Sequence, residues 1–265
     1  MGRRGADRGE RRVRAAALLN RGTTRLRRAA DAALAILLAP CCAACDRPLD
    51  APTRGPVCPE CWSRILPITP PICDACGDPL PSWRVVGLEH RRCRRCRRRG
   101  SVVMRSRAIG EYEGALRSIV HALKYGGRRS VARPLAALLA LHGRDVLGGA
   151  DLVVPVPLHR SRQRRRGFNQ AAELAQRLPI RSRPLLRRVR STPSQTDLPA
   201  AARQANVRGA FALRRRATVR GLIVVLVDDV STTGSTLEAC AHVLQAAGAR
   251  EVRALTVARV VSRSP

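Results

Sequence analysis

The sequence predicts an α/β fold with a doubly wound parallel sheet, preceded by a small cysteine-rich module. Three observations lead to this prediction. From about residue 101, short aliphatic runs alternate with segments of helical periodicity. The run 222–227 is apolar throughout, as in a strand buried on both faces. Nine of the ten cysteines lie between residues 41 and 96, so the 265-residue chain has room for one large domain and a small module.

The N-terminal region is basic and is expected to be an extension of the folded protein. We assign residues 1–33 to a basic, disordered extension, although 26–39 has the pattern of a short amphipathic helix. The apolar stretch 29–39 is too short to cross a membrane and contains Asp31. An arginine-rich start before this stretch resembles a signal peptide, but the metal spacing of the following cysteines argues against export. We therefore expect a cytoplasmic protein without membrane insertion.

The segment 34–100 contains four CxxC pairs, which predict a double zinc ribbon. A CxxC turn directs two sulfurs at one point, and two such turns complete a tetrahedral thiolate site. The spacing allows neighbouring pairs to combine in chain order or in a crossed arrangement. Four disulfides are the alternative, disfavoured in a cytosolic chain. Four thiolates leave no position open for water, so two structural Zn²⁺ ions are expected. The predicted ligands are Cys42, Cys45, Cys58, Cys61, Cys73, Cys76, Cys93 and Cys96.

The segment 101–265 is predicted to form the α/β domain. The expected strands are 108–112, 152–156, 185–189, 210–213, 222–227 and 252–258. The expected helices are 115–125, 131–141, 170–178 and a last one that includes 237–247. This order favours right-handed crossovers in a parallel sheet.

The most informative stretch is VVLVDDVSTTGST, residues 224–236. A buried strand ends at two carboxylates, and a loop of hydroxyl residues with one glycine leads into a helix. The first turn of a helix offers unpaired N–H groups and a positive dipole end, which suit a phosphate. Ligands of open α/β sheets bind at the carboxyl ends of the strands, where this loop would lie. The pattern therefore predicts a phosphate site with carboxylates at its mouth.

The net charge of +31 is weaker evidence for nucleic-acid binding than it first looks. Only Lys124 among the 50 basic residues is lysine, which indicates a coding bias toward arginine. Aromatic residues make up 2% of the chain, so base stacking along a single strand has few platforms. The sole lysine marks a place where a compact ammonium is favoured. The run 159–166 is expected to be a basic loop at the phosphate edge of the sheet.

The stretch 224–236 resembles the motif of type I phosphoribosyltransferases that binds 5-phosphoribosyl 1-diphosphate (PRPP). By this resemblance, the ribose hydroxyls are bound by Asp228 and Asp229. The 5′-phosphate would be held by Ser231, Thr232, Thr233, Gly234, Ser235 and Thr236. The fold implied is a type I phosphoribosyltransferase-like sheet.

Further strings extend the resemblance to the ComF/GntX family from about residue 34 to the C-terminus. They are EYEGALRSIVHALKYGG, VPVPLHRSRQRRRGFNQ and RSTPSQTDLPAAARQANVRGAF, which follow the CxxC pairs and precede the PRPP motif. The resemblance implies diphosphate binding by Lys124, Arg162 and Arg166. It also implies a flexible loop that contains Thr192, Gln195, Arg203 and Asn206.

Two functions follow from these observations. The first is Mg²⁺-dependent PRPP binding, with phosphoribosyl transfer as the reaction that such a site supports. The sequence indicates no acceptor. The alternative, which the resemblance implies, is a non-catalytic accessory protein of DNA uptake in natural competence. Such a protein would bind single-stranded DNA beside an uptake helicase and use PRPP as ligand or scaffold.

Overall fold

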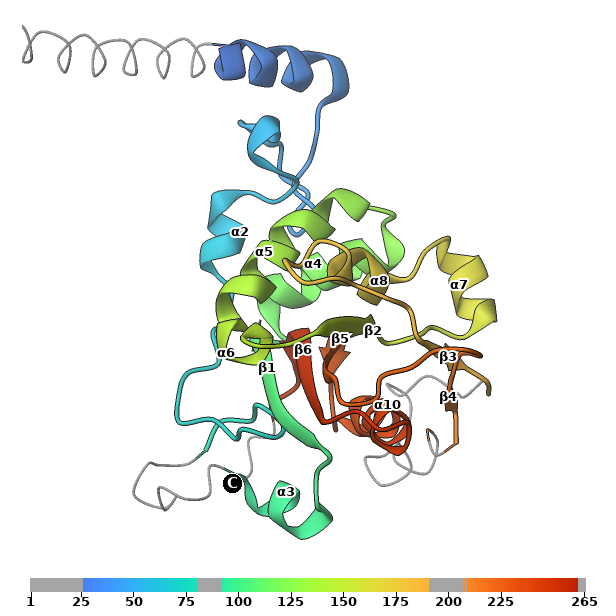
Figure 1. Ribbon diagram of the computed structural model, residues 1–265. Helices are drawn as coiled ribbons and strands as arrows, with labels where there is room; N and C mark the ends of the chain where they lie inside the picture. The colour runs from blue at the N-terminus through green and yellow to red at the C-terminus, as the bar shows by residue number, and fades with distance from the viewer. Residues whose placement is uncertain (1–25, 81–91, 191–206, 208, 262–265) are drawn as a thin grey trace, which may run out of the picture.

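The computed structural model describes residues 26–80, 92–190, 207 and 209–261. Its centre is a four-stranded parallel sheet in the order β1-β6-β5-β2 (Figure 1). The strands are β1 (Val103–Glu111), β2 (Leu152–Pro155), β5 (Ile223–Ser231) and β6 (Glu251–Arg259). The parallel sheet predicted from the sequence is confirmed.

Helices cover both faces of the sheet, as a doubly wound fold requires (Figure 1). One face carries α4 (Gly114–Tyr125), α5 (Ala132–His142) and α8 (Gln170–Ala175), and the other carries α10 (Ser235–Ala246). The strand β5 contributes to both cores: Val225 and Val227 pack with the first group, whereas Val224 and Leu226 pack with α10. The continuous apolar run of β5 is therefore explained by burial on two sides.

Two segments differ from the sequence prediction. The strands β3 (Leu186–Arg188) and β4 (Phe211–Leu213) form a separate antiparallel pair outside the main sheet. The basic run after β2, predicted to be a loop, forms the helix α7 (Arg160–Arg166). This helix contains no residue that breaks helices until Gly167 ends it in the left-handed conformation, and the His159 side chain caps its start.

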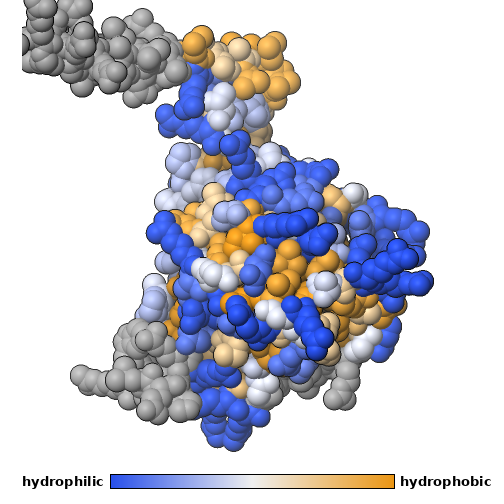
Figure 2. All heavy atoms as spheres, viewed as in Figure 1, coloured by the Kyte–Doolittle hydropathy of each residue, from blue (hydrophilic) through white to orange (hydrophobic). Residues whose placement is uncertain are grey.

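Residues 26–38 form a helix before the first cysteine pair, as the amphipathic pattern of 26–39 predicted, so the extension assigned to 1–33 is helical rather than disordered over 26–33. Its Asp31 is buried and accepts a hydrogen bond of 2.8 Å from the backbone N–H of Thr53. Apolar side chains at its end are exposed and form the orange group beside the grey segment in Figure 2. None of the helices in the described residues has the length and apolar character needed to cross a membrane.

The cysteine-rich segment folds into two knuckles that attach to the edge strand β1. The first knuckle (residues 41–61) includes η1 (Pro52–Arg54) and α2 (Pro59–Ser63), and the chain that leaves it pairs with β1 at Pro67 and Gly110. A Cβ atom at Gly110 would lie 2.4 Å from the carbonyl oxygen of Leu66, so only glycine permits this close approach.

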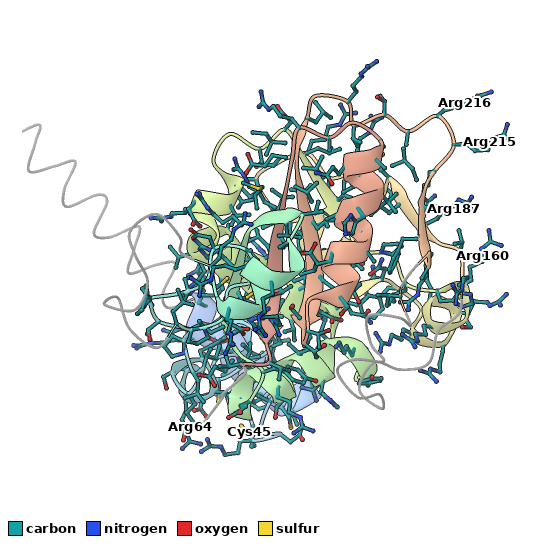
Figure 3. The ribbon with its side chains drawn as sticks, turned by 90° about the horizontal axis from the view of Figure 1, so that it is seen from below. Cys45, Arg64, Arg160, Arg187, Arg215 and Arg216 are labelled. Atoms are coloured by element: carbon teal, nitrogen blue, oxygen red, sulfur yellow. The ribbon has the colours of Figure 1, made fainter. Side chains whose placement is uncertain are left out.

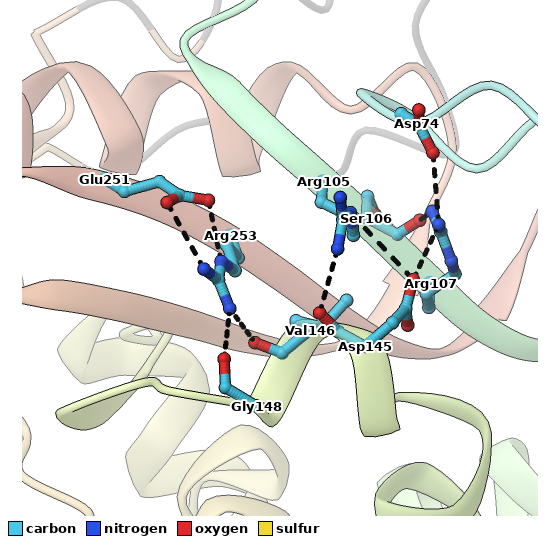
Figure 4. Close-up of polar contacts among 9 residues, drawn as sticks. All are labelled: Asp74, Arg105, Ser106, Arg107, Asp145, Val146, Gly148, Glu251 and Arg253. Carbon is cyan, nitrogen blue, oxygen red and sulfur yellow. Dashed lines mark hydrogen bonds and ion pairs between the residues drawn. The ribbon is translucent and has the colours of Figure 1, made fainter. Parts of the chain in front are cut away.

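The second knuckle (residues 72–80 and 93–96) reaches into α3 (Arg94–Arg99) and attaches to the middle of β1. The backbone N–H of Ser106 donates to the carbonyl oxygen of Asp74 at 2.7 Å. The Arg107 side chain joins Asp74, at 3.1 Å, to Asp145 of α6 (Arg144–Leu147), at 2.7 Å (Figure 4). Both knuckles thus occupy the free edge of the sheet, which would otherwise offer unpaired backbone groups.

Candidate functional site

The acidic pair lies within β5, not after it. The sequence predicted that the strand ends at Val227, but pairing with β6 continues to Ser231. Successive side chains of a strand point to opposite faces, so the two carboxylates face different helices. Asp229 contacts α4, whereas Asp228 interacts electrostatically with Cys240 of α10. The pair therefore presents two carboxylates with different environments at the carboxyl edge of the sheet.

Lys124, the only lysine of the chain, forms an ion pair with Asp229. The Nζ atom lies 3.0 Å from Oδ1, and both side chains are largely buried. Burial lowers the pKa of Lys124. The opposing effects, chiefly the charge of Asp229 and its hydrogen bond, outweigh burial, so the pKa of the ammonium group lies above its ordinary value. Lys124 is thus held as a cation beside the acidic pair, one residue before the tyrosine that contacts α7.

Asp228 is the carboxyl group with the more unusual electrostatics. Burial, followed by the charge of Asp229, raises the pKa of Asp228 to about 7. Its Oδ1 accepts a hydrogen bond of 2.8 Å from the backbone N–H of Asp229, and the positive charges of Lys124 and Arg188 oppose the rise in pKa. Asp228 therefore changes its charge near neutral pH.

The hydroxyl loop, residues 231–236, joins the end of β5 to the first turn of α10. Gly234 adopts φ of +78° directly before the helix, a conformation that favours glycine. Thr233 Oγ1 and Ser235 Oγ lie 2.7 Å apart, which gathers two hydroxyl groups at the helix N-terminus. Because α10 is twelve residues long, its first turn directs unpaired N–H groups and the positive dipole end at this loop.

Cations approach the acidic pair from α4, α7 and β3. Arg166 of α7 donates a hydrogen bond of 3.1 Å to the Tyr125 hydroxyl and lies over the Tyr125 ring. Burial and the nearby Arg162 both lower the pKa of Arg188, whose charge also acts on Asp228. Of the predicted cations, Lys124 contacts the acidic pair directly, Arg166 contacts the neighbouring Tyr125, and Arg162 interacts electrostatically with Arg188. Arg188 is an addition that no sequence motif indicated. The predicted loop residues lie outside the described part of the chain: Thr192, Gln195, Arg203 and Asn206.

The eight CxxC cysteines form two groups of four, paired in chain order. The first group is Cys42, Cys45, Cys58 and Cys61, and the second is Cys73, Cys76, Cys93 and Cys96. Within each group the sulfurs lie within 4.8 Å of one another. A tetrahedral zinc site with Zn–S bonds of about 2.3 Å requires sulfurs about 3.8 Å apart. The distances of 3.9 Å from Cys45 to Cys58 and 3.7 Å from Cys76 to Cys93 fit this requirement.

Backbone N–H groups also point at the cysteine sulfurs. Among the thiols of the second group, mutual hydrogen bonds lower the pKa of Cys73 and Cys93 to about 6 and raise the pKa of Cys96 well above its ordinary value. The backbone N–H of Cys93 donates to the Cys73 sulfur at 3.2 Å, and that of Cys58 donates to Cys42 at 3.3 Å. Since thiolates are the ligands of zinc, both groups suit structural zinc. Cys240, the cysteine outside the ribbon segment, is fully buried in the core.

The fold and the two cysteine groups define a phosphoribosyltransferase-type protein with a double zinc ribbon. The model of the phosphoribosyl transferase domain matches residues 164–264, and that of the double zinc ribbon domain matches residues 33–97.

Characterised relatives match most of the chain. It is 34% identical over 233 residues to the DNA utilization protein YhgH of Escherichia coli K12, covering 83% of this chain and 97% of the relative. It is 32% identical to the competence protein F of Haemophilus influenzae, with 78% and 91% covered. For the competence protein ComFC of Bacillus subtilis the identity is 28%, with 77% and 84% covered. The chain belongs to the ComF/GntX family.

Zinc content tests the metal assignment, with two adjacent cysteines as variant and control. We expect two zinc ions per wild-type chain, one for each group. Cys42→Ser removes a ligand and should leave one ion, whereas Cys41→Ser changes a cysteine outside both groups and should leave two. Elemental analysis of the purified proteins measures the content. Equal zinc loss in both variants would contradict the assignment.

The raised pKa of Asp228 predicts a pH-dependent stability. The folded state favours the protonated form, so the carboxyl opposes folding increasingly as the pH rises from its ordinary pKa of 3.8 to about 7. Asp228→Asn should therefore raise the melting temperature of the ligand-free protein, by a margin that grows from about pH 5 to about pH 8 and reaches roughly 5 °C. Thermal unfolding measures this margin. Asp46→Asn, at a side chain 87% exposed, should show no such growth. A margin independent of pH would refute the burial of this charge.

Proposed function

We propose that the chain binds PRPP together with Mg²⁺ at the carboxyl edge of β5 and β2. The observation that carries the proposal is the separation of charge at this edge. Carboxylates and the hydroxyl loop follow one another on β5 and α10. Lys124 of α4 pairs with Asp229, the charge of Arg188 of β3 acts on Asp228, and Arg166 of α7 contacts Tyr125 next to Lys124. PRPP has a matching order of groups: a 5′-phosphate, a ribose diol and a diphosphate.

Each group of PRPP then has a partner of suitable chemistry. Asp228 and Asp229 accept hydrogen bonds from the two ribose hydroxyls. The residues 231–236 bind the 5′-phosphate through backbone N–H groups and hydroxyls. Lys124, Arg162 and Arg166 balance the charge of the diphosphate. Mg²⁺, when bound, neutralises further diphosphate charge and makes it a better leaving group.

The same arrangement supports phosphoribosyl transfer. The bond from ribose C1 to the diphosphate breaks through a cation-like sugar, so the protein needs no nucleophile of its own. It must hold the ribose, neutralise the leaving group and exclude water. We propose a cytoplasmic protein, since PRPP is an intracellular metabolite.

A second candidate function is the handling of single-stranded DNA beside an uptake helicase. The names of the relatives refer to DNA utilization and competence. Four exposed arginines lie along one side of the molecule and point outward from α7, β3 and the segment after β4 (Figure 3). We call Arg160, Arg187, Arg215 and Arg216 the arginine strip. Guanidinium groups in such an array suit a phosphate backbone.

PRPP binding is tested by thermal unfolding with and without Mg²⁺–PRPP. At about a hundredfold excess over Kd, we expect the melting temperature of wild type to rise by about 5 °C or more. Asp229→Asn should abolish the rise, because it replaces a carboxylate that accepts from the ribose and that also holds Lys124 at the site. The exposed Asp46→Asn should keep it. If PRPP leaves the wild-type melting temperature unchanged, the proposed function is wrong.

DNA binding is tested by comparing two variants of equal charge. One replaces the arginine strip with glutamine, and the other replaces the exposed Arg64, Arg117, Arg133 and Arg144. If the arginine strip is a specific DNA-binding surface, the strip variant should lose about tenfold more affinity for a single-stranded oligonucleotide than the control variant, at about 150 mM salt. Fluorescence anisotropy over a salt series measures both. Equal losses would show that only net charge attracts the DNA.

A further inference from the structure

Arg259, at the end of β6, links the second knuckle to the hydroxyl loop. Its side chain is only 1% exposed, although it carries a permanent charge. The Nε atom donates to Asp78 Oδ1 at 2.6 Å, and Nη1 donates to Ser231 Oγ at 3.2 Å. Arg259 and Ser231 are also paired in register across β5 and β6. One guanidinium thus contacts a residue beside a cysteine group and a residue of the predicted phosphate loop.

A comparison of the two knuckles shows that zinc binding does not by itself require Asp78. Both knuckles contain the pattern CxxC-x-x-Pro-Leu, and Arg47 occupies in the first the position of Asp78 in the second. The backbones match: the carbonyl oxygens of Arg47 and Asp78 accept from Cys42 and Cys73 at 2.8 and 2.7 Å. The Arg47 side chain is exposed and pairs with Glu60, whereas Asp78 is buried against Arg259.

Asp78 is held from both sides. Its second oxygen, Oδ2, lies 3.0 Å from Arg95, which stands between the ligands Cys93 and Cys96 on α3. The carboxylate therefore joins an arginine of the metal site to an arginine of the sheet. A buried charge that loses one partner is strongly destabilised, so the orientation of Arg259 depends on Asp78.

The hydrogen bond to Ser231 has a chemical consequence. A hydroxyl that accepts from Arg259 directs its own hydrogen elsewhere, and that hydrogen can be donated to a phosphate oxygen. A pocket of about 450 Å³ adjoins this contact and is lined by Cys76, Arg95, Arg259, Ser231, Thr233 and Ser235, among others. Without Arg259, the Ser231 side chain and its loop would have room to turn into this pocket.

We propose that Arg259 is a positioning residue for the phosphate loop, and that the second knuckle sets the affinity for PRPP through Asp78. This inference rests on the proposed function. It assigns different roles to the knuckles: the first stabilises the fold, and the second also orients a donor of the ligand site.

The test measures the dissociation constant for Mg²⁺–PRPP by calorimetry, together with zinc content. Arg259→Met keeps an unbranched apolar stem but removes the guanidinium donors, and we expect at least about tenfold weaker binding with two zinc ions retained. Arg47→Met is the matched control at the equivalent position of the first knuckle, and its affinity should stay within about twofold of wild type.

A double-mutant cycle between Asp78→Asn and Ser231→Ala tests the link without replacing Arg259. Asp78 and Ser231 are each hydrogen-bonded to Arg259. If Asp78 affects PRPP binding through Arg259 and Ser231, Asp78→Asn should weaken binding clearly less when Ser231 is already alanine. Additive effects, or unchanged binding by Arg259→Met, would overturn the inference while wild type still binds PRPP. Failure of wild type to bind PRPP would instead overturn the proposed function itself.

Discussion

The pairing of β5 with strands on both sides is the constraint on which the site depends. Val227 is in register with Pro155 of β2, and Ser231 with Arg259 of β6, so the backbone of the acidic pair has little freedom to move. The pleat then forces the two carboxylates onto opposite faces. One meets Lys124 from α4, and the other faces α10. A loop could hold the same residues, but it could not hold two like charges in such different surroundings.

The sequence predicted those parts of the fold in which one local pattern has one structural meaning. The apolar run of β5, the helical periodicity of α4 and α10, and the CxxC turns are of this kind. The prediction from sequence failed where side-chain polarity does not indicate what the backbone does. Asp228 looked like the end of a strand because a charge interrupts the apolar run, yet main-chain pairing continues to Ser231. The arginine run of α7 looked like a loop because it is polar, although arginine favours helices.

Contacts between distant residues could not be predicted in this chain. Asp78 and Arg259 are 181 positions apart, and nothing near either residue indicates the other. The excess of arginine conceals the functional ones: Arg188 and Arg259 are two among 49, and only the structure shows that Arg259 is buried and Arg188 partly buried near the site. The combination of cysteine pairs was open for a similar reason, since the spacing permits two arrangements and only the structure shows which sulfurs lie together.

The attachment of the knuckles to β1 bears on what the ribbon does. A zinc ribbon that serves mainly to grip nucleic acid would present its basic face freely, joined to the domain by a linker. Here the first knuckle pairs with Gly110, the second is bonded to Ser106 and Arg107, and the two together cover the open edge of the sheet. The ribbon is therefore a part of the sheet's framework. The arginine strip lies on other elements, whereas Arg94, Arg97 and Arg98 are exposed on α3 beside the second cysteine group, so the strip and the ribbon are two distinct basic surfaces of this protein.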